Sequence, residues 1–177
     1  MKTYRAAVIG CSRMGAFIDN EVTDYQAIRL PYSHAAGFYT DGRIDLIACS
    51  DLRPAVMAQF GNHYDVPIDQ QYTDYREMIE KKRPDIVSVA TQPEQRAEIV
   101  IYAAEHGAKA IYAEKAMAAS MDEASTMVEV VERNGVFFNL GTNRRWHTGF
   151  GKMKEIIDSG ELGWLRTLII YSNGILF

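Results

Sequence analysis

A glycine-containing turn near the start of the chain carries residue types that can hold a phosphate group. It follows the apolar segment Tyr4–Ile9 and reads Gly10-Cys11-Ser12-Arg13-Met14-Gly15. A turn that binds the pyrophosphate of a dinucleotide must reverse tightly after a strand and bring backbone N–H groups to the start of a helix. Gly10 has the place of the tight reversal, and Gly15 the place where helix and strand pack closely. Ser12 replaces the middle glycine of G-x-G-x-x-G, and its small side chain offers a hydroxyl donor.

A carboxylate and two cations extend this candidate cofactor site. Asp51 follows a second apolar segment, Ile44–Cys49, where a carboxylate can accept hydrogen bonds from both ribose hydroxyls of NAD or can cap the next helix. Arg13 would add a cation near the phosphates, and Met14 belongs to the same cofactor-binding turn. Arg53 leaves NADP open, because an arginine can pair with a 2′-phosphate. We expect NAD, with NADP as the alternative.

A second charged pair, Glu114 and Lys115, directly follows the apolar segment Ala110–Ala113. Ligands of open α/β sheets bind beyond the carboxyl ends of the strands, so both side chains are expected to point at the cleft. A lysine in a partly enclosed site can orient a hydroxyl or carbonyl and relay a proton. The alternative interpretation is an ion pair in a surface loop.

The pattern of apolar and polar residues predicts the elements that position these side chains. Strands are expected at Tyr4–Ile9, Ile44–Cys49, Asp85–Ala90, Ala110–Ala113 and Val136–Leu140, with a weaker one at Gln71–Tyr72. Helices are expected at Pro54–His63, Asp74–Lys82, Pro93–His106 and Ser120–Asn134. Strands that alternate with helices through short loops predict an α/β fold with a doubly wound parallel sheet.

One connection is longer than a crossover helix requires. The segment Asp19–Tyr39 has the character of an insertion that is rich in aromatic and small residues and interrupted by Leu30-Pro31. It leaves the sheet on the side of the strands' carboxyl ends. Two interpretations are open: an elaborated surface loop that packs its own aromatic side chains, or a lid over the cofactor cleft.

Composition and charge exclude several classes of protein. The chain has 177 residues and a net charge of −4, and its basic runs are too short for a nucleic-acid surface. No apolar run approaches the ~20 residues of a membrane helix, so no membrane partner is expected. Two cysteines without metal-ligand spacing indicate a reduced, cytoplasmic protein without a metal site. No Lys-Ser/Thr follows the glycines, which excludes a P-loop.

Seven stretches of the chain occur in a recognisable order: VIGCSRMG, IACSDLRP, QYTDYREMI, RPDIVSVATQPEQRAEIV, AEKAMAASMDEASTMV, GVFFNLGTNRRW and KMKEIIDSGELG. In order and spacing they resemble the Gfo/Idh/MocA family of NAD(P)-dependent sugar and polyol oxidoreductases. The resemblance implies a dinucleotide-binding Rossmann domain over residues 1–145. Over residues 146–177 it implies the beginning of a second domain that holds substrate and makes the oligomer contacts.

By this resemblance Lys115 is the catalytic lysine, and Glu114 precedes it as in the family's Glu-Lys-Pro sequence. Ala116 replaces the family's proline. Because a cis bond before a residue other than proline is unfavourable, we expect a trans bond there or a small shift of Lys115. Thr91 and Pro93 match the loop that flanks the nicotinamide ribose.

Other positions depart from the family pattern or extend it. Arg96 stands where many members have histidine, which puts a histidine contact there in doubt. Asn143 and Arg144 could meet a substrate hydroxyl or carboxylate, or could form an interdomain hinge. None of the four histidines has a convincing catalytic setting, and a solvated or packing role is favoured for each. His34, in the insertion, comes nearest to a catalytic setting.

The last residues predict a helix at Phe150–Ser159 and a strand at Leu165–Tyr171, the first elements of a truncated α+β domain. In the resembled family that domain also supplies an aspartate and a histidine beside the lysine, and the chain ends before such a pair. We therefore expect these residues to belong to a longer protein that forms a homo-oligomer through the second domain. The 177-residue chain alone is expected to be inactive.

Two functions are consistent with these observations. The first is an oxidoreductase that moves a hydride between a nicotinamide and a hydroxyl-bearing carbon of a sugar, a polyol or a related small molecule. Lys115 would orient and polarise that hydroxyl. The second is a non-catalytic module that only holds a dinucleotide.

Overall fold

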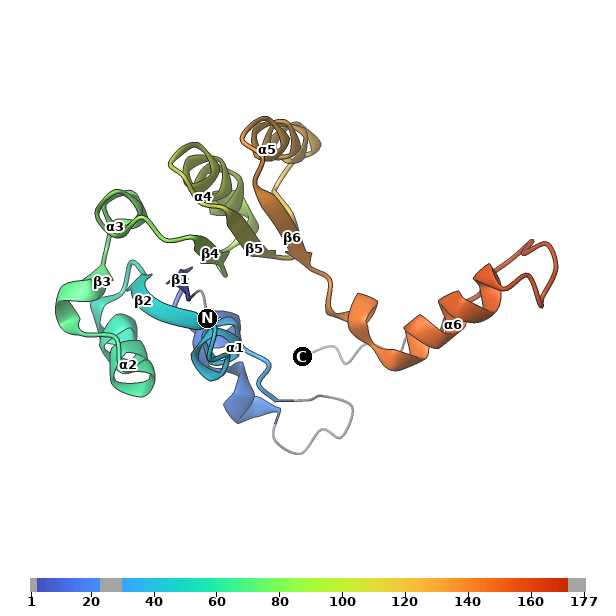
Figure 1. The fold of residues 1–177 in the computed structure, drawn as a ribbon, viewed down its shortest axis with the longest axis horizontal. Coiled ribbons are helices and arrows are strands. Elements are labelled where there is room, and N and C mark those ends of the chain that lie inside the picture. Colours follow the sequence, from blue (N-terminus) through green and yellow to red (C-terminus); the bar gives the residue numbers. More distant parts are fainter. Residues whose placement is uncertain (1–2, 23–29, 172–177) are drawn as a thin grey trace. The chain divides into compact units, whose positions relative to one another are not determined.

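The computed structural model describes residues 3–22 and 30–171. The chain divides into two compact units, Met1–Gly141 and Thr142–Phe177. The first unit contains every strand that the structure describes (Figure 1).

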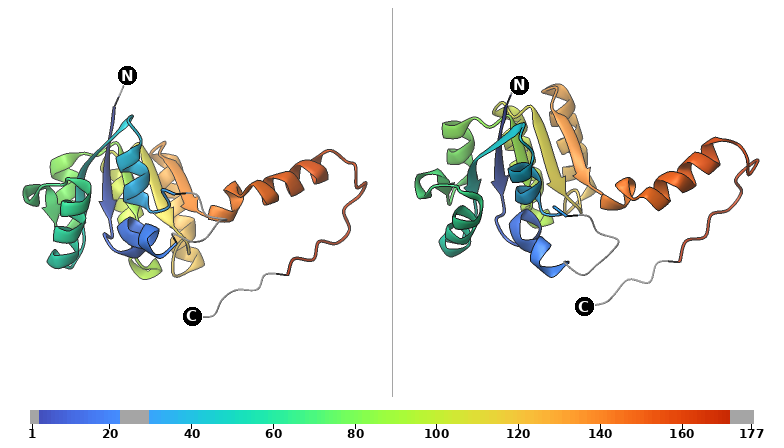
Figure 2. Two further views of the ribbon diagram at one scale, coloured as in Figure 1. Left: turned by 90° about the horizontal axis from the view of Figure 1, so that it is seen from below. Right: turned by 60° about the horizontal axis from the view of Figure 1, so that its bottom comes forward.

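The first unit is built on one sheet of six parallel strands in the order β3-β2-β1-β4-β5-β6. Its strands are β1 (Tyr4–Ile9), β2 (Ile44–Ser50), β3 (Gln71–Tyr72), β4 (Ile86–Val89), β5 (Ala110–Glu114) and β6 (Phe137–Gly141). They run in one direction, so their carboxyl ends share one edge (Figure 2). This strand order is that of a Rossmann fold, and the predicted doubly wound α/β fold is confirmed.

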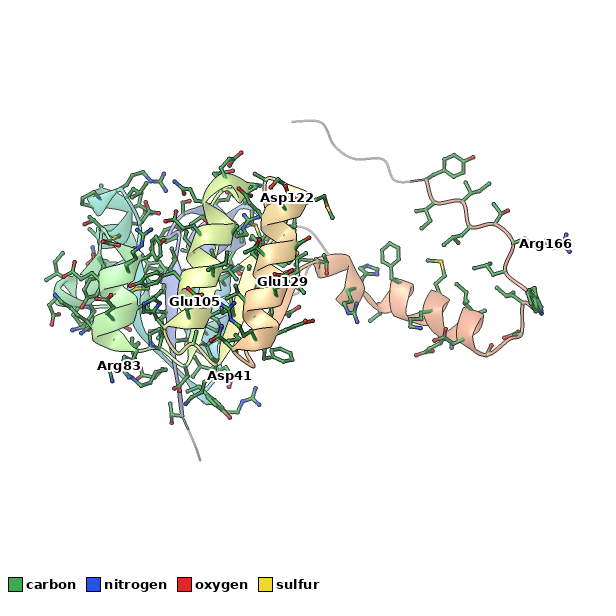
Figure 3. The ribbon with its side chains drawn as sticks, turned by 90° about the horizontal axis from the view of Figure 1, so that it is seen from above. Asp41, Arg83, Glu105, Asp122, Glu129 and Arg166 are labelled. Atoms are coloured by element: carbon green, nitrogen blue, oxygen red, sulfur yellow. The ribbon has the colours of Figure 1, made fainter. Side chains whose placement is uncertain are left out.

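Helices cover both faces of the sheet. Figure 1 shows α3, α4 and α5 on one face and α1 and α2 on the other. Their bounds are α1 (His34–Thr40), α2 (Pro54–Tyr64), α3 (Tyr75–Lys82), α4 (Pro93–Glu105) and α5 (Met121–Arg133). Charged side chains such as Glu105, Asp122 and Glu129 project from the outer surfaces of α4 and α5 (Figure 3). The helices predicted from apolar periodicity therefore place their apolar faces on the sheet and these three charges on the outer side.

The core has two layers because successive residues of a strand face opposite sides of the sheet. Ala7 and Ile9 join the apolar cluster beneath α3, α4 and α5. Val8 joins the cluster beneath α1 and α2, together with the free cysteines Cys11 and Cys49. Strand β1 is thus buried on both faces, as its continuous apolar sequence predicts.

In its described residues, the connection from β1 to β2 contains more helix than the sequence predicts, and less of it is an insertion. It begins with a π-helical turn at Arg13–Phe17 and a 3₁₀ turn at Ile18–Glu21. Its last part, assigned from the sequence to the insertion, is the crossover helix α1, which packs on β1 and β2. The interpretation of this part as a loop or lid is therefore wrong. Residues 23–29 lie outside the described residues, so the structure does not test the lid interpretation for them.

Asp19 holds the two ends of this connection together. Its carboxylate accepts hydrogen bonds from the backbone N–H groups of Tyr32 and Ser33, at 2.6 and 2.9 Å. Ser33 in turn caps α1, because its side chain accepts a hydrogen bond from the N–H of Ala36. The start of α1 is therefore held by Asp19, which binds the residues before the helix, and by Ser33, which caps its first turn.

The second unit contains a 3₁₀ turn at Asn143–Trp146 and helix α6 (Thr148–Asp158). The predicted helix Phe150–Ser159 is thus present with slightly shifted ends. The predicted strand Leu165–Tyr171 is wrong: this segment has no regular secondary structure and pairs with no strand among the described residues. A strand forms only where a neighbouring strand satisfies its backbone N–H and C=O groups.

No helix within residues 3–22 and 30–171 combines the length and the apolar content that a membrane crossing requires.

Candidate functional site

The turn after β1 has a backbone that only glycine accommodates at its two ends. Gly10 has φ +90°, and a Cβ there would lie 2.7 Å from the carbonyl oxygen of Ala90. A Cβ on Gly15 would lie 1.8 Å from the carbonyl oxygen of Gly10. Real Cβ atoms do not approach backbone oxygens so closely, so both glycines are required by packing and not only by flexibility.

Between these glycines the chain starts its π-helical turn. The backbone N–H groups of Arg13 and Met14 lie in the first helical positions, where helix geometry provides no acceptor. Ser12 precedes them with its side chain free of any cap hydrogen bond. The turn therefore presents a small hydroxyl and backbone donors at the carboxyl edge of the sheet, as the sequence predicts for a pyrophosphate turn.

A cavity of about 370 Å³ opens at this edge of the sheet. It brings together five of the residues predicted from the sequence: Gly10, Ser12, Asp51, Arg53 and Thr91. Its wall continues past these residues to the side chains of Thr73, Tyr75, Gln95, Glu98 and Ile99. The end of β1, the end of β2 and the loop after β4 thus form one concave surface.

Asp51 has a buried carboxylate whose two oxygens are both in use. Its Oδ2 accepts a hydrogen bond from the N–H of Cys11 at 2.9 Å, which ties β2 to the turn after β1. Its Oδ1 accepts hydrogen bonds from the backbone N–H and Nε of Arg53, each at 3.0 Å. Burial raises the pKa of Asp51, but these hydrogen bonds and the charge of Arg53 outweigh it and hold the pKa below its ordinary value of 3.8.

The lowered pKa of Asp51 predicts how stability depends on pH. Ionised Asp51 favours the folded chain, so its contribution is complete above about pH 4 and is lost as the pH falls through the folded-state pKa. We expect the free energy of unfolding to fall less steeply between pH 4 and pH 2 in Asp51→Asn than in the unsubstituted chain. Urea denaturation at a series of pH values measures this. Equal slopes would contradict the role of these hydrogen bonds.

Arg13 and Pro93 lie near the turn and the loop after β4 but do not line the cavity. The Nε of Arg13 pairs with Glu21 at 2.7 Å, and both side chains are exposed. Pro93 is the first residue of α4, a position that needs no N–H donor. The Arg13 guanidinium is therefore directed along the following 3₁₀ turn in this structure.

Lys115 lies at the same edge of the sheet as the cavity. Ile9 pairs with Val89, and Val89 with Ala113, so the ends of β1, β4 and β5 are level. Lys115 follows Ala113 by the same number of residues as Thr91 follows Val89. Its side chain is exposed, and the cavity wall does not include it.

Glu114 is placed differently from the expectation that it points at the cleft. It is the last residue of β5, only 5% exposed, and its Oε1 lies 3.2 Å from Nε2 of His34. Its Oε2 accepts a hydrogen bond from the backbone N–H of Lys115 at 3.2 Å. Glu114 therefore faces the layer of α1, and only Lys115 is directed outward.

The bond between Lys115 and Ala116 is cis, so the expectation of a trans bond is wrong. A side chain from α4 holds this part of the chain. The buried guanidinium of Arg96 donates hydrogen bonds to the carbonyl oxygens of Ala116 and Thr91. The arginine that stands where many family members have histidine thus joins the loop after β4 to the loop after β5.

Asn143 lies in the 3₁₀ turn of the second unit. The side chain of Arg144 lies outside the described residues. Their proposed contact with substrate stays a prediction.

Sequence reasoning did not identify Ser88 at this edge, and it singled out His34 among the histidines without predicting its partners. Both are buried, and they contact each other at 2.5 Å. The sequence carries one signal for His34: Ser33 is a strong N-cap residue, and a helix was needed before β2. Across the described part of the chain, no three histidine, cysteine, aspartate or glutamate side chains gather closely enough to hold a metal ion.

The comparison with known proteins agrees with this geometry. A family model described as "Oxidoreductase family, NAD-binding Rossmann fold" matches residues 4–142. The chain belongs to this family, Gfo/Idh/MocA. The family expected from the motifs is thereby confirmed, and so is NAD as the expected cofactor.

Relatives of this Gfo/Idh/MocA chain include enzymes named for inositols. A scyllo-inositol 2-dehydrogenase (NAD(+)) of Bacillus subtilis is 28% identical over 160 residues, 90% of this chain and 41% of that protein. An inositol 2-dehydrogenase of Salmonella typhimurium is 30% identical over 95 residues, 53% of this chain and 28% of that protein. The crystal structure of a myo-inositol 2-dehydrogenase from Lactobacillus plantarum matches 92% of this chain and 43% of its own, with a TM-score of 0.74 and 25% identity. The chain thus spans less than half the length of each.

The residues around the cavity fit the dinucleotide of this family. A carboxylate that accepts only, such as ionised Asp51, suits two ribose hydroxyl donors. The Arg53 side chain, which forms an ion pair with Asp51, is 59% exposed. It can therefore turn into solvent and free Asp51 to bind a ribose. Gly10 and Ser12 leave the neighbouring wall free of bulky side chains.

Proposed function

We propose that the protein is an NAD-dependent oxidoreductase that transfers a hydride to or from a hydroxyl-bearing carbon of a polyol, with ring polyols of the inositol type as the substrate class. The observation that carries this proposal is the single cavity that joins the turn after β1 to Asp51. The names of the Bacillus, Salmonella and Lactobacillus relatives support the substrate class.

The chain's own residues would divide the work in the following way. Bound NAD supplies the hydride acceptor or donor. The turn Gly10–Gly15 receives the pyrophosphate, and Asp51 accepts hydrogen bonds from the adenosine ribose. Thr91 and Pro93 flank the other ribose. Lys115 donates a hydrogen bond to the reacting hydroxyl and takes part in moving its proton.

A titration with NADH and NADPH, followed by fluorescence, tests the cofactor half of the proposal. We expect NADH to bind more tightly than NADPH, because the Asp51 carboxylate repels a 2′-phosphate. In Asp51→Ala the Kd for NADH should rise by about ten- to a hundredfold, the effect of losing hydrogen bonds to a charged acceptor.

Asp41→Ala is a matched control for this titration. Asp41 accepts hydrogen bonds from the backbone N–H and Nε of Arg43, two residues later, just as Asp51 does from Arg53. Asp41 does not line the cavity. Its replacement should leave the Kd unchanged. Failure of both dinucleotides to bind at millimolar concentration would contradict the proposal.

A further inference from the structure

Three buried polar side chains from separate elements meet close to Lys115. His34 is the first residue of α1, Ser88 lies in β4 and Glu114 ends β5. The Nδ1 of His34 lies 2.5 Å from the Ser88 hydroxyl oxygen, and its Nε2 lies 3.2 Å from Oε1 of Glu114. His34 and Glu114 are each 5% exposed, and Ser88 is fully buried.

The hydrogen bonds fix where the ring hydrogen of His34 lies. Burial raises the pKa of Glu114, but the hydrogen bond and charge of His34, with the N–H and charge of Lys115, hold it below the ordinary value of 4.5. Glu114 is therefore ionised near neutral pH and can only accept. The Nε2 of His34 must therefore carry a hydrogen and donate it to Oε1 of Glu114, while the Ser88 hydroxyl can either donate to Nδ1 or accept from it.

Glu114 links His34 to Lys115 through its two carboxylate oxygens. Its second oxygen, Oε2, accepts the hydrogen bond from the backbone N–H of Lys115. On the other side Gly141 leaves just enough room, since a Cβ there would lie 3.0 Å from Oε1 of Glu114. The Glu114 carboxylate is thus held between a donor from α1, a donor from its own chain and the backbone of β6.

Two other side chains face this cluster. The ring of Tyr112 lies 4.5 Å from that of His34, and burial followed by the charge of Glu114 raises its pKa, so it stays neutral near pH 7. The Arg96 guanidinium, which interacts electrostatically with Glu114, donates hydrogen bonds to the carbonyl oxygens of Ala116 and Thr91. The cluster of His34, Ser88 and Glu114 therefore contains one carboxylate and one histidine, and the cations Arg96 and Lys115 interact with its carboxylate.

We infer that His34 is a positioning residue, which fixes the backbone of Lys115 through Glu114 and so sets where the lysine ammonium meets substrate. The role rests on the proposed function of Lys115, whereas the chain of contacts is measurable without cofactor or substrate. His34 suits this role because its own position is fixed by Ser33 and Asp19 at the start of α1.

Two substitutions separate this role from plain packing. His34→Gln keeps an N–H near the position of Nε2 and can still donate to Glu114. His34→Asn places its amide near Nδ1, where it reaches Ser88 but falls short of Glu114. In His34→Asn we expect amide hydrogen exchange at Lys115, measured by NMR, to quicken about three- to tenfold, and in His34→Gln less than about twofold.

Gly141→Ala provides a second route that leaves His34 intact. The added methyl group should displace the Glu114 carboxylate and quicken exchange at Lys115 in the same way. In the full-length protein, with NAD and an inositol as substrates, kcat should fall further in His34→Asn than in His34→Gln, while the Kd for NADH is unchanged in both.

Equal exchange at Lys115 in both histidine variants and in the unsubstituted protein would overturn the inference. So would a rise that is the same in both variants and shared by all amides of β5, because general loosening needs no specific contact. Failure of the proposed function has a different signature. In that case NADH does not bind to the unsubstituted protein, while the exchange pattern at Lys115 is still ordered by the two substitutions.

Discussion

Replacing Gly15 by alanine is expected to lower the free energy of unfolding by about 3 kcal/mol, at the upper end of overpacking effects. The added Cβ would lie 1.8 Å from the carbonyl oxygen of Gly10. That oxygen belongs to the backbone of the tight turn, so no side-chain rotation relieves the clash. The turn must open, and Gly10 sits against the backbone of Ala90 on its other side.

Thermal and urea unfolding, followed by circular dichroism, measure this loss, and an NADH titration measures its effect on the cofactor site. Gly37→Ala is the matched control, since Gly37 lies within α1 and a Cβ there meets nothing within 4 Å. It should stabilise the chain by about 0.5–1 kcal/mol, the usual gain of alanine over glycine in a helix. An unchanged free energy of unfolding and an unchanged Kd for NADH in Gly15→Ala would contradict the close packing of the first helical turn on the backbone of Gly10.

In the full-length protein, replacing Lys115 by alanine is expected to lower kcat for NAD reduction by an inositol by about 10²- to 10⁴-fold, the range of a general acid–base group. The Kd for NADH should change little, because Lys115 does not line the cavity that holds Asp51 and the turn. Initial rates with myo-inositol and scyllo-inositol, read at the NADH absorbance, measure kcat, and the fluorescence titration measures Kd.

Lys109→Ala is the control for the charge change. Lys109 stands just before β5, at the opposite edge of the sheet, where its Nζ pairs with Asp85 at 2.5 Å. Because the lysine is exposed, the pair is worth less than about 1 kcal/mol, and turnover should be unaffected. Equal loss of turnover and of NADH binding in Lys115→Ala would indicate a structural role for Lys115 and contradict the proposed chemistry.

Local sequence patterns predict most of the framework for a physical reason. A buried parallel strand is apolar on both faces and is bounded by turn residues, so β1 and β4 are visible without any knowledge of their partners. Helix starts are equally local: Pro54, Pro93 and Ser120 mark the beginnings of α2, α4 and α5. The edge at which Gly10, Asp51 and Thr91 meet then follows from the parallel order of the strands.

Contacts between distant parts of the chain are what the sequence does not reveal. His34 and Glu114 are separated by 80 positions, and nothing near either residue predicts their meeting. Likewise, the hold of Arg96 on Ala116 is invisible in a pattern that only shows an arginine in place of histidine. The segment Leu165–Tyr171 fails for the same reason, since β-propensity predicts a strand but only a partner strand can form one.

Asp19 anchors the start of α1 to the helical turns that follow β1. Its carboxylate binds the backbone N–H groups of Tyr32 and Ser33, so the start of the helix that carries His34 is fixed relative to Asp19. A substitution of Asp19 would therefore displace His34 and, through Glu114, the backbone of Lys115.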